Sequence, residues 1–100
     1  MPDALTHIAL LDAKRDEIRQ IAAKHGARNI RVFGSVARGE AAPDSDFDFL
    51  VDAGPITSSW FPAGLIVDLE QILGRRVEVV TEKGLDPLLR ENVLREATPV

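Results

Sequence analysis

Cysteine is absent from the sequence, which excludes disulfide bonds and thiolate metal sites. No apolar run approaches the ~20 residues that a membrane-spanning helix needs, so we expect no contact with a membrane. The first residues also lack the basic and apolar regions of a signal peptide, and we therefore expect a cytoplasmic protein. Histidine is scarce: His7 and His25 have no partner at metal-ligand spacing, and we expect both at the core edge or the surface.

Basic residues are too few for a surface that coats nucleic acid. The chain has 12 Lys and Arg against 16 Asp and Glu, a net charge of -4. Affinity for nucleic acid depends on many basic contacts with phosphate, so no direct nucleic-acid binding is expected. The length of 100 residues predicts one domain, residues 1–100, with no room for a separate substrate domain. A second substrate must then lie on an open face or belong to a partner.

The spacing of apolar residues predicts an α/β protein of the α+β kind, with a small mixed β-sheet and helices packed against it. Ser59 is the expected N-cap of the helix that follows it. The second strand is nearly continuous in hydrophobicity, which favours a central place in the sheet. The expected helices cover about Thr6–His25, Val36–Glu40 (one turn), Trp60–Leu73 and the segment from Pro87 onward, and the expected strands cover Asn29–Phe33, Asp46–Asp52 and Val77–Thr81.

A glycine–serine pair followed by two aspartates is the most informative motif of the chain. Gly34 and Ser35 follow the first expected strand, and after ten residues Asp46 and Asp48 enter the second. Because side chains alternate along a strand, the two carboxylates project from the same face. Such a pair usually implies a shared proton, a cationic partner or a metal ion, and oxygen ligands without histidine or cysteine favour magnesium. The alternative is a pair of solvent-facing strand residues.

Gly34, Ser35 and Arg38 are the expected phosphate-binding residues. Glycine lets the backbone approach a phosphate closely, Ser35 can donate its hydroxyl and its amide, and the planar fork of Arg38 suits bidentate contact with an oxyanion. Two alternatives remain open at this point. Ser35 can instead be a helix cap, and Arg38 can instead form a structural pair with Asp46 or Glu40.

The motif resembles the signature of the DNA polymerase beta-like nucleotidyltransferase superfamily. The residues Ala37-Arg38-Gly39-Glu40 within it make it similar to the minimal nucleotidyltransferase (MNT) proteins of that superfamily. This resemblance implies the polymerase beta-like fold and a magnesium-dependent transfer of AMP from ATP to an acceptor hydroxyl. It also implies an antitoxin whose partner is a helical HEPN ribonuclease toxin, modified on a tyrosine near its active site.

Nucleotidyl transfer uses two metal ions held ~3.5 to 4 Å apart between carboxylates, and a third carboxylate usually supports the ion that activates the nucleophile. Glu78 is the candidate, because it interrupts the apolar strand Val77–Thr81 where a carboxylate has no packing role. The expected catalytic and metal-binding set is therefore Asp46, Asp48 and Glu78, with two Mg²⁺ ions. In MNT relatives this place is usually an aspartate, so the longer Glu78 implies weak activity.

Other interpretations stay open. Glu78 can be an edge-strand charge that prevents strand pairing, in which case Asp52 or Asp68 is the next candidate for the third carboxylate. The protein can also be a binding module that neutralises its toxin without chemistry. A small-molecule nucleotidyltransferase is a further alternative, but such enzymes add an acceptor domain for which this chain has no room.

Overall fold

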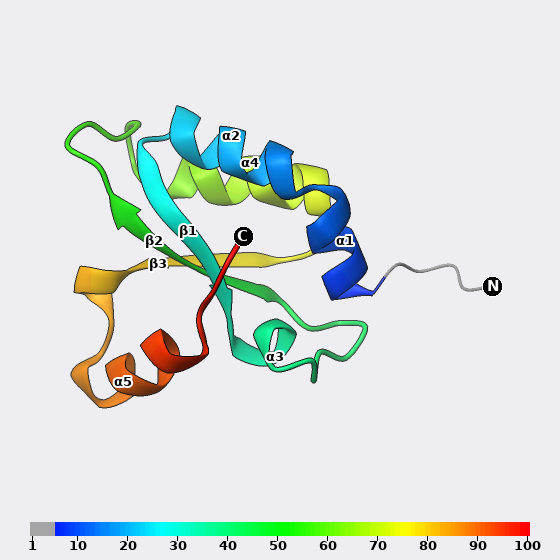
Figure 1. The fold of residues 1–100 in the computed structure, drawn as a ribbon. Coiled ribbons are helices and arrows are strands. Elements are labelled where there is room, and N and C mark those ends of the chain that lie inside the picture. Colours follow the sequence, from blue (N-terminus) through cyan, green and yellow to red (C-terminus); the bar gives the residue numbers. More distant parts are fainter. Residues whose placement is uncertain (1–5) are drawn as a thin grey trace.

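A four-stranded β-sheet forms the centre of the structure, a computed structural model that describes residues 6–100 (Figure 1). Its strands are β1 (Ala27–Phe33), β2 (Phe47–Ala53), β3 (Val77–Thr81) and β4 (Thr98–Pro99), in the order β3-β2-β1-β4. β2 pairs antiparallel with β1 and parallel with β3, and β4 pairs antiparallel with β1. The predicted mixed sheet with a central second strand is therefore confirmed. β4 is not predicted by the sequence pattern, because two residues carry no periodicity.

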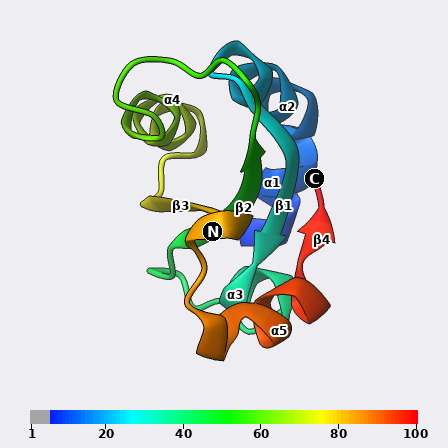
Figure 2. The same ribbon diagram turned by 90° about the vertical axis from the view of Figure 1, so that its left-hand side faces the viewer.

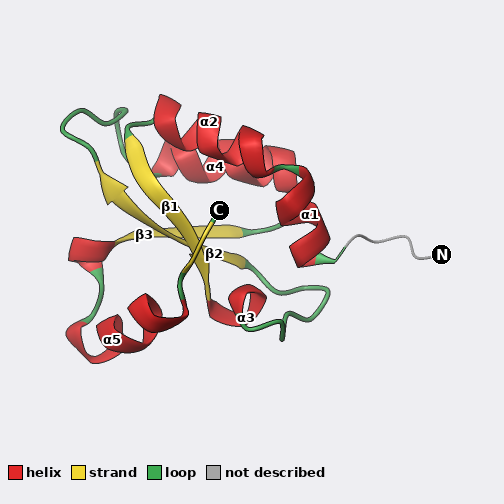
Figure 3. Ribbon diagram, in the orientation of Figure 1, coloured by secondary structure: helices red, strands yellow, loops and turns green. Residues whose placement is uncertain are grey.

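Three helices cover one face of the sheet, and a fourth lies on the opposite side (Figure 3). The covering helices are α1 (His7–Ala13), α2 (Arg15–Lys24) and α4 (Ala63–Leu73). The short α3 (Gly34–Ala37) follows β1, and a 3₁₀ turn, η1 (Glu82–Gly84), leads from β3 to α5 (Pro87–Glu96) on the other side. Within the described part of the chain, no helix is long and apolar enough to cross a membrane.

The hydrophobic core lies between the sheet and the three covering helices. Phe47 and Phe49 on β2 are fully buried, and their parallel rings stack with centroids 5.8 Å apart. Leu65 and Leu69 of α4 and Ile18 of α2 pack into the same cluster. Complete burial of a side chain of this size contributes roughly 1.5 to 3 kcal/mol, so this layer holds β2 in a fixed position.

The first predicted helix, Thr6–His25, is wrong as a single element. The structure divides it at Lys14, whose backbone (φ -108°, ψ 10°) ends α1 and begins α2. The axes of α1 and α2 point in different directions (Figure 1). Leu10 and Leu11 of α1 and Ile18 of α2 nevertheless all pack in the same core cluster. The apolar stripe continues through both segments, so the periodicity does not indicate the break.

Two other predicted boundaries are also wrong. The helix expected from Trp60 begins only at Ala63, and Ser59 does not cap it, because Pro62 occupies the N-cap position. Trp60 has a left-handed backbone (φ 59°), which a right-handed helix does not accommodate, and its side chain is 89% exposed. β1 begins at Ala27 and passes through a register shift at the left-handed Asn29, where the sequence predicts the strand to start.

The sheet has two distinct ends, and the topology decides which segments meet at each. Because β1 and β2 run antiparallel, the end of β1 lies beside the start of β2, with Phe33 opposite Asp48. The parallel β3 brings Glu78 opposite Asp48 on the other side. α3 and α5 lie on the side of the sheet opposite α2 and α4 (Figure 2), and α3 directly follows the end of β1. The predicted glycine turn and carboxylates therefore gather at the end that α3 and α5 flank.

Candidate functional site

Gly34 and Asp48 are in direct contact at the junction of β1 and α3. Gly34 has a φ of 76°, a backbone conformation that favours glycine. A Cβ atom at this position would collide with the carboxylate of Asp48. The glycine therefore serves both the turn and the close approach of backbone to carboxylate, which is the arrangement that the sequence motif predicts.

Three carboxylates lie near one another beside this turn. Asp48 on β2 lies opposite Glu78 on the paired strand β3, and Asp46 immediately precedes β2. Burial, together with the negative charges of Glu78 and Asp46, raises the pKa of Asp48 to about 6. The side chains of Asp48 and Glu78 form no hydrogen bond or ion pair with the described residues, and Asp46 has only the distant, 86% exposed Arg76 at 4.0 Å. The positive charge of Arg38 lowers the pKa of Asp48 by less than burial and the neighbouring carboxylates raise it, so the site concentrates negative charge.

These carboxylates fit a magnesium ion that a substrate phosphate also contacts. Among residues 6–100, no group of three or more acidic, histidine or cysteine side chains is close enough to hold a metal ion by itself. Mg²⁺ normally keeps several waters and uses one or two carboxylates together with substrate phosphates, so it does not need a complete protein cage. The oxygen-only donors and the raised pKa of Asp48 are both consistent with a site that a cation would complete.

Arg38 is held by two glutamates. Its Nε donates to Glu40 at 2.9 Å, and its Nη1 donates to both carboxylate oxygens of Glu96 at 3.1 and 3.2 Å. The alternative in which Arg38 pairs with Asp46 is wrong, whereas the Glu40 pairing is confirmed. Glu96 also accepts a hydrogen bond from the Gly34 amide at 2.8 Å. Sequence reasoning missed Glu96, because 58 and 62 residues separate it from its two partners and its place at a helix end gives no local signal.

Ser35 lies half-buried in the first turn of α3. The N-cap of α3 is Phe33, with no side-chain capping bond, so the alternative of Ser35 as a helix cap is wrong. The Ser35 hydroxyl makes no hydrogen bond with any described residue. It is therefore available to a ligand beside Gly34.

A different polar cluster occupies the other end of the sheet. His25 is buried, and its two ring nitrogens lie 2.7 Å from Ser58 Oγ and 2.7 Å from Asp68 Oδ2. The hydrogen bond from His25 lowers the pKa of Asp68. Gly64 contacts the ring so closely that a Cβ there would lie 2.9 Å from Cε1. This cluster joins α2, the loop after β2 and α4, and its charges are satisfied internally.

Both fallback candidates for the third carboxylate are engaged elsewhere. Asp68 lies in the His25 cluster, away from Asp48, and Asp52 forms an ion pair with Arg31 at 2.9 Å. His7 is buried too, and its Nε2 donates to the Ser45 carbonyl at 2.7 Å, with the ring against that of Phe47. Among the three candidates for the third carboxylate, Glu78 is the one that the fold places opposite Asp48.

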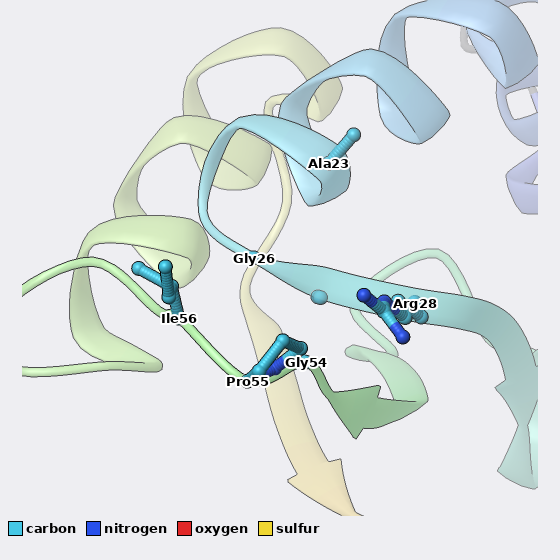
Figure 4. A pocket seen from close by; sticks show the side chains of 7 residues that line it. Ala23, Gly26, Arg28, Gly54, Pro55 and Ile56 are labelled. Atoms are coloured by element: carbon cyan, nitrogen blue, oxygen red, sulfur yellow. The ribbon is translucent and has the colours of Figure 1, made fainter.

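A cavity of about 360 Å³ lies at the His25 end of the sheet (Figure 4). Gly26 precedes β1 and Gly54 follows β2, so this cavity is at the opposite end from Gly34. Its lining carries one charged residue, Arg28, and no acidic side chain. The cavity therefore offers no carboxylate that could hold a metal ion.

Comparison with known proteins finds relatives over most of the chain. Residues 15–100 match the model of the nucleotidyltransferase domain. The protein adenylyltransferase MntA of Thermococcus cleftensis is 41% identical over 92 residues, which cover 92% of this chain and 90% of that protein. A solved structure assigned to a minimal nucleotidyltransferase is 49% identical, with a TM-score of 0.82 over 96% of this chain and 100% of that one. A toxin–antitoxin crystal structure with AMP-PNP shares the fold at 21% identity, with a TM-score of 0.71 over 84% of this chain and 69% of that one.

Proposed function

Because this chain belongs to the nucleotidyltransferase domain family, we propose that it transfers AMP from ATP to a tyrosine hydroxyl of a cognate HEPN toxin and so acts as an antitoxin. One observation carries the proposal: Gly34, Asp48 and Glu78 meet at one sheet end, where the side chain of Asp48 has no hydrogen bond or ion pair among the described residues. A binding site for a metal ion that the phosphates of a nucleotide also contact explains why these carboxylates are retained.

The comparisons support the acceptor class and the nucleotide. Protein adenylyltransferase MntA is a relative at 41% identity over most of both chains. Solved structures of the same fold include toxin–antitoxin complexes, one of them with AMP-PNP.

Each residue has a distinct proposed part in the transfer. The Gly34 turn, the Ser35 hydroxyl and Arg38 bind phosphate oxygens, and Asp46 and Asp48 hold magnesium with Glu78 on the β3 side. The bound ions would neutralise charge on the phosphates. The acceptor oxygen attacks the α-phosphorus, the bond to pyrophosphate breaks, and Glu78 accepts the proton that the hydroxyl loses. Asp48 must be ionised for this arrangement, and the fold raises the pKa of its carboxyl group to about 6.

A specific observation favours a second candidate, an antitoxin that neutralises by binding alone. Glu78 is exposed on the edge strand β3, and its side chain has no partner among the described residues. An exposed charge on an edge strand also discourages unwanted strand pairing, which requires no catalysis.

The Glu78→Gln variant separates the two candidates. If Glu78 takes part in chemistry, the variant keeps ATP affinity but loses transfer of labelled AMP to the purified toxin by ~10² to 10⁴-fold. Glu91→Gln is the matched control, because Glu91 is an exposed glutamate paired only with Arg95. Toxin neutralisation in cells is followed in parallel. Full neutralisation by Glu78→Gln, with no labelling by either variant or by the natural protein, would establish the binding antitoxin instead.

A further inference from the structure

Glu96 places a carboxylate in the predicted phosphate-binding pocket. It is the last residue of α5, and its side chain reaches the Gly34 amide at 2.8 Å and Arg38 Nη1 at 3.1 Å. These are two of the three groups that the phosphate-binding assignment uses. The Glu96 side chain is only 25% exposed, so neighbouring residues cover most of it.

The Glu96 carboxylate makes the contacts that a phosphate group would make. A backbone amide and a guanidinium fork recognise oxyanions through charge-assisted hydrogen bonds, and carboxylate and phosphate use the same hydrogens. A phosphate cannot bond to the Gly34 amide and to Arg38 Nη1 while Glu96 occupies both. Binding of a nucleotide at this place therefore requires the Glu96 side chain to leave.

A displaced Glu96 finds no alternative cation on its own helix. Arg95 pairs with Glu91 at 2.9 Å, and Arg90 pairs with Glu82 at 3.5 Å. Glu96 is also one of the negative charges that act on Asp48. Displacement thus leaves a negative charge close to other negative charges, which opposes the binding of any anionic ligand at this place.

We infer that Glu96 is an internal competitor of the nucleotide, an anion that occupies the Gly34 amide and Arg38 and must be displaced before a phosphate group binds there. The inference rests on the proposed function, since it assumes that Gly34 and Arg38 bind the nucleotide. It goes further by assigning an autoinhibitory contact to a residue outside the sequence motif.

The test compares Glu96→Gln with the natural protein, using inorganic triphosphate, ATP and AMP as probes in calorimetric titrations without and with magnesium. Glutamine keeps the shape of Glu96 but lacks its charge, so we expect inorganic triphosphate and ATP to bind about tenfold more tightly. We expect AMP to gain less, because Glu96 repels a ligand with fewer negative charges less strongly. Glu91→Gln removes a charge from the same helix and should stay within about twofold of the natural protein.

A second readout guards against an indirect effect. The Gly34 amide proton resonance should move upfield in Glu96→Gln, because its charged acceptor is lost. In an Arg38→Gln background, the gain from Glu96→Gln should fall below about twofold, since the two residues act on one pocket. Circular dichroism and thermal unfolding establish that each variant is folded.

The outcomes distinguish this inference from the proposed function. Equal or weaker triphosphate binding by Glu96→Gln, or binding by neither protein, overturns the inference and leaves Glu96 as a residue that positions Arg38. Tighter triphosphate binding without any AMP transfer by the natural protein supports the inference and refutes the proposed function. AMP transfer by a protein whose Glu96→Gln variant shows no tighter binding does the reverse.

Discussion

Asp48 and Asp68 lie toward opposite ends of the sheet, and their surroundings act on them in opposite directions. Burial and two neighbouring carboxylates raise the pKa of Asp48 to about 6. The hydrogen bond from His25 lowers the pKa of Asp68, and the charge of Lys24 adds to this effect. Together they outweigh burial, which acts in the opposite direction. One aspartate is therefore destabilised in its charged form by the fold, and the other is stabilised.

The difference separates a place built for a ligand from a place built for the fold. The His25 cluster satisfies its own polar groups and ties the loop after β2 to α2 and α4. The Asp48 site keeps like charges together with only partial compensation from Arg38, which lowers the stability of the protein without a ligand. Cavity volume gives no such distinction, because the 360 Å³ cavity lies at the His25 end.

A methyl group at Gly34 should have the largest effect on function. Gly34→Ala directs a Cβ into the Asp48 carboxylate, which must then move. We expect AMP transfer to fall at least about 10²-fold, because the displaced carboxylate no longer aligns the reacting groups. Gly39→Ala is a matched control: Gly39 has a similar φ of 73°, but its Cβ would meet nothing within 4 Å. Transfer rates at matched folding decide the matter. Equal losses in both variants would mean that backbone strain, not the contact with Asp48, is responsible.

Removal of the His25 ring should reduce stability and leave the function intact. We expect His25→Ala to lower the free energy of unfolding by about 2 kcal/mol, because Ser58 and Asp68 lose a buried hydrogen-bonding partner. Urea unfolding measures the loss, and ATP titration should give an unchanged affinity. A large loss of ATP affinity in a folded His25→Ala protein would show that the two ends are not independent.

Neutralising Asp48 should have a smaller effect, of opposite sign. The folded state raises this pKa from 3.8 to about 6, so it binds the proton more tightly than the unfolded state does. The charged form of Asp48 therefore lowers the free energy of unfolding. This loss is absent below about pH 4, grows between about pH 4 and pH 6, and is complete above about pH 6. After allowance for solvent screening, Asp48→Asn should raise the unfolding free energy by about 1 kcal/mol at pH 7.5 and by little at pH 4. Asp44→Asn, in an exposed loop position, should show no such pH dependence.

The sequence predicts the carboxylate end well, because its information is local. Gly34, Ser35, Asp46 and Asp48 fall within fifteen consecutive residues, and the alternation of a strand is enough to place both aspartates beside the glycine turn. Glu78 follows from the anomaly of a carboxylate in an apolar strand. The parallel pairing of β2 with β3 then brings it opposite Asp48, as the third-carboxylate hypothesis requires.

What the sequence did not reveal depends on contacts between distant segments. Glu96 reaches Gly34 across 62 residues, and His25 reaches Asp68 across 43, so neither partnership has a local signal. The break at Lys14 and the late start of α4 arise from how helices must turn to cover one sheet face. Apolar periodicity reports which face of a helix is buried, but not where its axis changes direction.

We propose that the nucleotide binds at the Asp48 end of the sheet and not at the Asp68 end. Calorimetric titration of ATP, with and without magnesium, distinguishes the two ends when the double variant Asp46→Asn, Asp48→Asn is compared with the control Asp68→Asn. We expect magnesium-dependent binding by the natural protein and by Asp68→Asn, and none by the double variant, which should remain folded. Equal ATP affinity in the double variant and the natural protein, or loss of binding only in Asp68→Asn, would contradict it.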